Sequence, residues 1–226
     1  MTFIQPLDTD SKTRPRISRE LDPVEVRILG ALMEKQLATP EYYPLTLNAL
    51  VAACNQKSNR EPVMDLGDDE VEGALARLQD EKLVWRVMGG RAVRFDHNLD
   101  SRWHIDKREK ALLTMLFLRG AQTSGELRGR SDRLQNFESV TEVEETLRDM
   151  AGHSEPLVQQ LAKRPGQKEE RWIHTVGGVW EEPVPQRHES EVRSGGEPLS
   201  VRVQRLEAEV EVLKAELHEL KSKLGE

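Results

Sequence analysis

The sequence is short of cysteine, of aromatic side chains and of long apolar runs, and the first and last of these exclude classes of protein. Cys54 is the single cysteine among 226 residues, so the chain cannot form a disulfide with itself. No apolar run of membrane-spanning length is present, and residues 1–21 lack the apolar core of a secretory signal. The six histidines show no metal-ligand spacing. We therefore expect a cytoplasmic protein with no membrane association, no metal and no cofactor.

Signals for catalysis are also lacking. No glycine loop suited to phosphate binding precedes a basic helix. Cys54 falls on the apolar side of its predicted helix, which favours a packed core thiol over a nucleophile. We therefore expect a protein that is not an enzyme.

Charge is abundant instead. Charged residues make up 32% of the chain and hydrophobic residues 37%, with 40 acids against 33 bases and a formal charge of −7. The modest hydrophobic fraction is gathered into periodic runs, which predicts small helical domains with exposed segments. The acidic balance argues against indiscriminate coating of nucleic acid, although a local basic face would still permit DNA binding.

Residues 21–105 are predicted to form three helices and a β-hairpin. Asp22 is placed to cap the first helix, and Glu25, three residues later, completes a capping box. A second short helix and a polar loop lead to a third helix that begins at about Asp68. Gly89-Gly90 then joins two extended runs in a tight turn. Three helices followed by a hairpin is the order of a winged helix, a variant of the helix-turn-helix.

The same order recurs in residues 106–180. Thr123 and Ser139 each begin a capping-box pattern at the start of a short helix, and two extended runs follow. A shift of 72 residues superposes Glu70-Val71-Glu72 on Glu142-Val143-Glu144. We interpret the recurrence as a tandem duplication, giving two winged-helix domains. The alternative is two unrelated helical stretches that share an amphipathic pattern.

Both ends of the chain differ in composition from its middle. Residues 1–20 have no apolar period and are predicted to be disordered, and residues 181–198 have the prolines, glycines and scattered charges of a linker. Residues 199–226 are predicted to form a parallel coiled-coil dimer, in which Glu209 of one copy faces Lys214 of the other. The predicted seam consists of Leu199, Val203, Leu206, Val210, Leu213, Leu217, Leu220 and Leu224. The alternative is a solitary amphipathic helix.

A winged helix usually places its third helix in the DNA major groove, but both candidate helices here are acidic. Residues 68–82 carry six acids against two bases, and residues 139–151 carry four acids against one base. Phosphates would repel such helices, so any DNA contact is expected from the basic wings and one loop. The candidate nucleic-acid contacts are Arg86, Arg91, Arg94, Arg128, Arg130, Arg133, Lys163, Arg164 and Lys168. The alternative is a set of solvated hairpin faces, with Trp85 stacked beneath Arg94.

The loop of residues 55–60 is rich in hydrogen-bonding side chains. Its candidate contacts for a partner or a phosphate are Asn55, Gln56, Lys57, Asn59 and Arg60. The alternative is that these side chains cap the carbonyl groups at the end of the preceding helix.

Four stretches of the sequence resemble the YceH family of uncharacterised bacterial proteins. They are residues 43–50, 53–63, 118–128 and 165–174. The resemblance covers about residues 21–177 and implies tandem winged-helix domains with a role in DNA binding or regulation, but no catalytic residues. Ala121 stands where similar chains often have proline, a departure that affects no functional residue.

These patterns support two functional hypotheses. The first is a tandem winged-helix protein, mainly α-helical with small β-hairpin wings and a C-terminal coiled-coil helix, that acts in transcription regulation or another DNA-associated process. The second is a protein-interaction scaffold resembling the winged-helix subunits of chromosome-condensing complexes. In that alternative the acidic third helices contact a protein partner instead of a DNA groove.

Overall fold

The computed structural model describes residues 18–89, 92–163, 169–177 and 214. The chain divides into two compact units, Met1–Trp180 and Glu181–Glu226. Lys214, in helical conformation, is the described part of the second unit. The predicted disordered tail before residue 18, the linker and the eight predicted seam residues from Leu199 to Leu224 therefore lie outside the described residues, and the parallel dimer stays a prediction.

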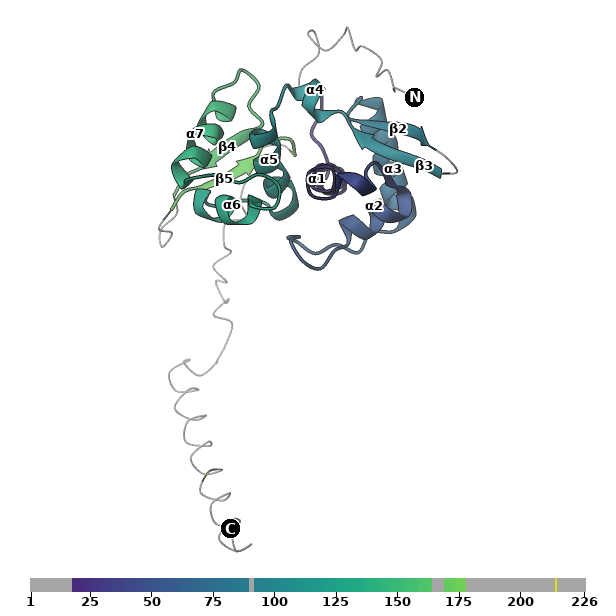
Figure 1. Cartoon of the computed structure of the whole chain (residues 1–226), viewed down its shortest axis with the longest axis horizontal. Helices are drawn as coiled ribbons and strands as arrows, with labels where there is room; N and C mark the ends of the chain where they lie inside the picture. The colour runs from purple at the N-terminus through teal and green to yellow at the C-terminus, as the bar shows by residue number, and fades with distance from the viewer. Residues whose placement is uncertain (1–17, 90–91, 164–168, 178–213, 215–226) are drawn as a thin grey trace, which may run out of the picture. The chain divides into compact units, whose positions relative to one another are not determined.

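The first unit is mainly helical and contains two small antiparallel sheets (Figure 1). The predicted class, mainly α-helical with small β-hairpins, is confirmed. The elements in chain order are α1 (Pro23–Ala38), the 3-10 turn η1 (Pro40–Tyr42), β1 (Leu45–Thr46), α2 (Leu47–Cys54), α3 (Asp68–Asp80), β2 (Val84–Gly89), β3 (Ala92–His97), α4 (Leu99–Trp103), α5 (Lys107–Arg119), α6 (Ser124–Ser131), α7 (Val140–Ala151), β4 (Val158–Leu161) and β5 (Arg171–His174). No described helix is long and apolar enough to cross a membrane.

Side-chain caps fix the starts of most helices. The predicted capping box of Asp22 and Glu25 is present at α1, and that of Thr123 and Glu126 is present at α6. At α7 the predicted box is only half formed. Ser139 accepts a hydrogen bond from the backbone of Glu142, but the Glu142 carboxylate accepts one from the N–H of residue 138 instead of residue 139. The helix still begins where the sequence predicted.

Each half of the unit contains a hairpin after its third helix. In the first sheet the strand order is β1-β3-β2, with Arg86 opposite Phe95 and Met88 opposite Val93. In the second sheet β4 pairs with β5, and an isolated bridge joins Gln122 to Trp172 of β5. Both predicted hairpins are confirmed, whereas strand β1 and helix α4 were not predicted.

The order of three helices and a hairpin occurs twice in one unit that has one hydrophobic core. Val71, Leu75 and Leu78 are the buried face of α3, and the residues at the corresponding spacing of α7 are buried as well, namely Val143, Leu147 and Met150. The predicted boundary between residues 105 and 106 lies inside this unit, between α4 and α5.

Helices α1 and α5 pack against each other in the middle of the unit (Figure 1). Gly30 of α1 makes this close approach possible. A Cβ atom placed on Gly30 would lie 2.9 Å from Cδ2 of Leu118 and 3.0 Å from Cβ of Phe117, both on α5. Those two side chains are themselves buried, so neither can move freely.

Replacement of Gly30 by alanine is expected to destabilise the protein by about 1 kcal/mol. Overpacking a core costs about 1–3 kcal/mol, and the better helix propensity of alanine returns about 1 kcal/mol of this. Urea denaturation followed by circular dichroism measures the change. The half-buried helical Gly73, where the nearest atom to an added Cβ is 3.7 Å away, is the matched control and should be stabilised on replacement by alanine. Equal responses at both glycines would contradict a tight crossing.

Candidate binding surfaces

The exposed stripe of α3 is acidic. Asp69, Glu72, Ala76 and Asp80 recur at helical spacing and are all exposed. Arg77 is the only base of this helix, and its side chain is held on a neighbouring face. Its Nη2 lies 2.6 Å from Oδ2 of Asp22 and its Nε lies 3.0 Å from Oε1 of Glu25. We call the stripe of these four exposed residues the α3 acidic stripe.

The site that holds Arg77 is a small ion-pair network. Glu25 has a fully buried side chain and also receives two hydrogen bonds from Arg19, at 2.8 and 2.6 Å. Burial alone would raise the pKa of Glu25, but hydrogen bonds from Arg19, from the backbone N–H of Asp22 and from Arg77, together with the charge of Arg19, lower it below its usual value. Glu25 is therefore ionised, which keeps Arg77 turned towards α1.

The exposed face of α7 is less uniform. Glu145 and Asp149 are exposed, but Arg148 is exposed beside them and pairs with Glu144 at 2.7 Å. Its negative charge is therefore partly balanced within the helix. Of the two third helices, α3 presents the stronger acidic surface.

The two arginines of the first wing that the structure describes, Arg86 and Arg94, both contact other groups of the protein. Arg94 donates from Nη1 to the carbonyl oxygen of Pro44 at 2.7 Å, and the guanidinium carbon of Arg86 lies 6.0 Å from the centre of the Phe95 ring. The cation–π contact of this hairpin thus joins Arg86 to Phe95, in place of the expected stacking of Trp85 beneath Arg94. Arg86 remains exposed to solvent. Arg91 lies outside the described residues.

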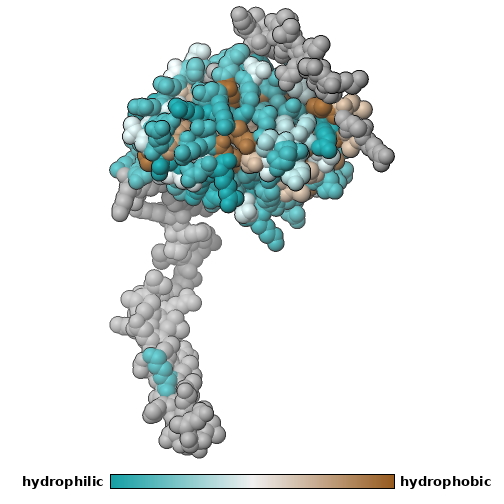
Figure 2. Space-filling model, in the orientation of Figure 1, coloured by the Kyte–Doolittle hydropathy of each residue, from teal (hydrophilic) through white to brown (hydrophobic). Residues whose placement is uncertain are grey.

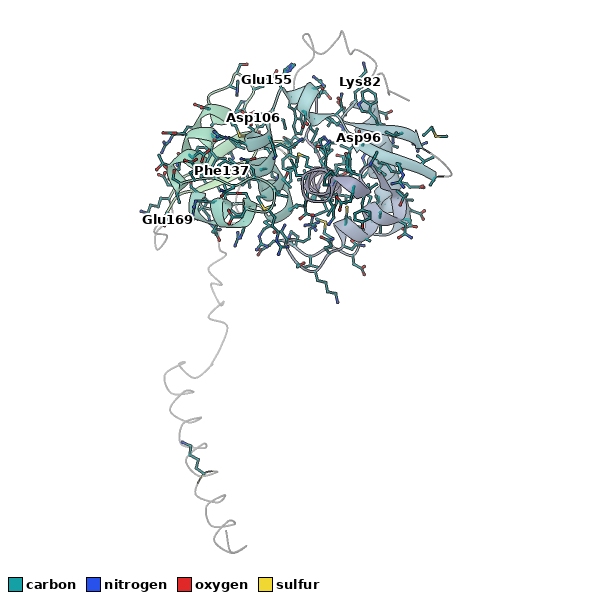
Figure 3. The ribbon with its side chains drawn as sticks, in the orientation of Figure 1. Lys82, Asp96, Asp106, Phe137, Glu155 and Glu169 are labelled. Carbon is teal, nitrogen blue, oxygen red and sulfur yellow. The ribbon has the colours of Figure 1, made fainter. Side chains whose placement is uncertain are left out.

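The other basic candidates fall into two groups. Arg128 donates to the carbonyl oxygens of Phe137 (Figure 3) and of residue 138. Arg130 donates to the side chains of Gln122 and Glu126. These two arginines hold local structure. Arg133 and Lys163 are exposed, and no ion pair joins either to a described residue. Arg164 and Lys168 lie outside the described residues.

In the loop of residues 55–60, Arg60 points inward. Its side chain has no exposed surface, and its Nη1 and Nη2 form a two-pronged contact with Oε1 and Oε2 of Glu34, at 3.1 and 2.6 Å. Its Nε and Nη2 also donate to the carbonyl oxygen of Ala53 at 3.1 and 2.8 Å. Burial alone would raise the pKa of Glu34, but the hydrogen bonds and charge of Arg60, with help from Asn59, lower it. The guanidinium ties the loop to α1 and α2.

The neighbours of Arg60 have similar roles. Asn55 exchanges two hydrogen bonds with the backbone of Leu66, at 2.9 and 2.8 Å. Gln56 accepts a hydrogen bond from Arg60, and Asn59 donates one to Glu34. Lys57 alone among the five candidates is exposed. This geometry supports the alternative in which the polar residues organise the loop, and it leaves Lys57 as the candidate for an external contact.

A second buried arginine, Arg27 of α1, was not among the predicted site residues. It donates to the carbonyl oxygens of Cys54 at 3.1 Å and Pro62 at 2.6 Å, so it braces the same loop. Arg27 and Glu34 are seven residues apart and therefore share a face of α1. That spacing, on a helix with an otherwise apolar face, is the signal that would have identified both as internal charges.

A partly buried polar group connects α1, β3, α4 and α5. Gln36 Oε1 lies 2.9 Å from Nε2 of His97 and accepts a hydrogen bond from Nζ of Lys110 at 2.7 Å. Lys110 also pairs with Asp100 at 2.6 Å. Beside them the hydroxyl of Tyr43 donates to Asp96 at 2.6 Å, and Asp96 is labelled in Figure 3.

No set of three or more histidine, cysteine or carboxylate side chains in the described part of the chain is placed to hold a metal ion. Cys54 is fully buried, as predicted, and burial raises the pKa of its thiol to about 12. The thiol is therefore protonated and inaccessible.

The fold and these surfaces define a helical protein with internally braced loops and one strongly acidic exposed helix. Residues 21–167 match the family described as "Protein of unknown function, DUF480". A UPF0502 protein of Koribacter versatilis is 44% identical over 194 residues, covering 85% of this chain and 90% of the relative. One of Chromobacterium violaceum is 44% identical over 210 residues, covering 92% and 94%. One of Burkholderia multivorans is 48% identical over 170 residues, covering 75% and 72%.

The chain therefore belongs to the DUF480 family, whose curated relatives carry the UPF0502 name. The family predicted from the four sequence stretches is confirmed.

Proposed function

We propose that the first unit consists of two winged-helix modules in tandem. The repeated order of three helices and a hairpin supports this, as does the matching burial of α3 and α7. A third extended segment lies beside each hairpin in the corresponding place, β1 in the first half and Gln122 in the second. Such repetition is typical of a duplicated module.

The tandem modules act as a non-enzymatic protein-interaction scaffold, similar in principle to the winged-helix subunits of chromosome-condensing complexes. The α3 acidic stripe carries this proposal. In a winged helix that reads DNA, the exposed side of the third helix faces the phosphates and bases. Here that side bears three carboxylates, and Arg77 is held by Asp22 and Glu25. Phosphates would be repelled, whereas a basic protein surface would be attracted.

A DNA-associated or transcription-regulatory role is the second candidate, supported by Arg86, Arg133 and Lys163. All three are exposed and have no ion-pair partner among the described residues. Binding through such scattered cations would be weak, salt-sensitive and largely independent of base sequence. Both candidates are compatible with a cytoplasmic parallel dimer held by residues 199–224, which would present two copies of each surface.

Capture of partners from a cell lysate, with and without nuclease, distinguishes the two roles. The expected result is that partners persist after nuclease treatment and that Glu72→Lys with Asp80→Lys reduces their recovery about tenfold or more, because the attraction becomes repulsion. The matched control is Glu41→Lys with Asp65→Lys, which reverses two exposed carboxylates that pair with no described residue. That control should retain the partners.

The opposite pattern would establish the DNA role. In that case nuclease abolishes recovery, the α3 variant behaves like the wild type, and replacement of Arg86, Arg133 and Lys163 by glutamate removes a gel shift seen at low salt. Each lost phosphate contact should lower the salt slope of binding by about one unit.

A further inference from the structure

Among the described residues, the first hairpin has a strand edge with no hydrogen-bonded neighbour. Strand β2 is the outer strand of the β1-β3-β2 sheet. The N–H of residue 98 donates to the carbonyl of residue 83 at 2.9 Å. Residues 83 and 98 are therefore a hydrogen-bonded pair, next to the pair of Val84 and His97 in the same ladder. Hydrogen-bonded pairs alternate along antiparallel strands, so Trp85 and Val87 face β3 with their N–H and C=O groups. Those of Arg86 and Met88 point away from β3.

The opposite side of β3 supports this assignment. The N–H of His97 donates to the hydroxyl of Tyr43 at 2.9 Å, on the β1 side of the sheet. The pair of Val84 and His97 is therefore not hydrogen-bonded, in agreement with the alternation. No backbone hydrogen bond reaches Arg86 or Met88 from another described segment outside the sheet. An open edge of this kind is a template for one more strand.

The side chains along this edge combine one cation with exposed apolar groups. Met88 is 74% exposed and Val93, opposite it on β3, is 39% exposed, whereas the face shown in Figure 2 is mostly hydrophilic. Arg86 lies two residues before Met88, on the same side of the strand, and is exposed. Strand β2 carries no acidic residue.

We propose that the β2 edge binds an extended peptide segment of a partner protein, in which a carboxylate residue and an apolar residue stand two positions apart and therefore share one face of the peptide. The peptide backbone would pair with the outward groups of Arg86 and Met88, one of its carboxylates would face Arg86, and an apolar side chain would cover Met88 and Val93. The β2 edge is separate from the α3 acidic stripe, so this proposal stands independently of the function proposed above.

A second copy of this chain fits the edge less well. A two-fold antiparallel pairing that uses the outward groups of Val84, Arg86 and Met88 together would place Arg86 directly opposite Arg86 of the other copy. Like charges in that position destabilise a strand pair. Arg86 thus discourages self-pairing while favouring an acidic strand, and apolar Met88 and Val93 favour a peptide over a nucleic acid.

The test uses the full chain and a synthetic acetylated, amidated peptide of the sequence Thr-Glu-Thr-Val-Thr-Glu-Thr-Val, in which the glutamate and valine side chains share one face of the extended chain. Changes in the backbone amide signals of Arg86 and Met88 report binding by nuclear magnetic resonance. The peptide with lysine in place of glutamate should bind at least about tenfold more weakly, because its positive charge would be repelled by Arg86. In the bound peptide the N–H groups of every second residue face β2. N-methylation of those residues should abolish binding, whereas N-methylation of the residues between them should be tolerated.

Two protein variants complete the test. Arg86→Pro removes the outward N–H without breaking a bond to β3, a position where an edge strand accepts proline, and should abolish binding. Arg86→Gln keeps the N–H and should bind with intermediate strength. If Arg86→Pro fails to fold, the N-methylated peptides decide alone, because they leave the protein unchanged.

Several results would overturn the proposal. These are equal binding of the lysine and glutamate peptides, an equal response to both N-methylated sets, and perturbation of the Arg86 and Met88 amides by duplex DNA but not by peptide. Signals that shift with protein concentration in the absence of peptide would instead assign the edge to a second copy.

Discussion

Replacement of Arg60 by alanine is expected to lower the free energy of unfolding by about 3–5 kcal/mol, the usual cost of removing one partner of a buried ion pair. The change removes both hydrogen bonds from the Arg60 guanidinium to the Glu34 carboxylate. The Glu34 side chain, which is only 10% exposed, then lacks its main counter-charge. The change also frees the carbonyl oxygen of Ala53. Since a domain is stable by only about 5–15 kcal/mol, urea denaturation should show a large shift of the midpoint.

Two comparisons identify the cause of this loss. Lys57→Ala, in the same loop but exposed, should change stability by less than about 0.5 kcal/mol. Removing both charges, with Arg60→Met and Glu34→Leu together, should cost less than Arg60→Met alone, because no buried charge is left unpaired. A wild-type midpoint for Arg60→Ala would contradict an internal role and return Arg60 to the candidate contact surface.

The sequence predicted the helices and hairpins because their signals are local. Asp22 with Glu25, and Thr123 with Glu126, lie within one helical turn of each other, and a glycine pair marks the first hairpin turn. Strand β1 was missed because it is two residues long and pairs with β3 about 50 residues later. Helix α4, with five residues, is too short to show an apolar period.

The candidate surfaces were harder to predict because the sequence shows donors but not their direction. Arg77 is paired with Asp22 and Glu25, which lie 55 and 52 residues earlier. Arg60 is turned inward by Glu34, 26 residues earlier. In both cases the sequence shows how many bases a segment contains. The charge that the segment presents to a partner is still different from that count, because an ion pair with a distant segment neutralises the base. The exposed side of α3 is therefore acidic, as the sequence predicted, and the pairing of Arg77 with Asp22 and Glu25 leaves it more acidic than the charge count of the helix indicates.

His97 is expected to make the protein lose about 2 kcal/mol of stability between pH 7.5 and pH 5. Its Nδ1 accepts a hydrogen bond from the N–H of Leu99 at 3.3 Å, and its Nε2 lies 2.9 Å from Gln36 Oε1, which can only accept. The ring is therefore neutral, with its proton on Nε2. Burial lowers the pKa of His97 to about 4; the charge of Asp100 opposes the shift and that of Lys110 adds to it.

The sign of the effect follows from the two protonation states. The unfolded chain takes up a proton on this histidine near pH 6.5, whereas the folded protein does so only near pH 4. Stability is therefore complete above about pH 6.5 and falls as the pH drops towards 4. His97→Gln should be less stable at pH 7 but should lose less stability between pH 7.5 and pH 5 in urea titrations. His174, whose pKa burial also lowers to about 4, accounts for part of the remaining slope.

The exposed His153 is the matched position for the same substitution, because its side chain lies in solvent and not in the core. If His97→Gln and His153→Gln show the same pH dependence, His97 does not titrate as a buried neutral ring. Its hydrogen bonds to Leu99 and Gln36 would then have to open in the folded protein at about pH 6. The contact of His97 with Gln36, which joins β3 to α1, would in that case be open to water rather than packed.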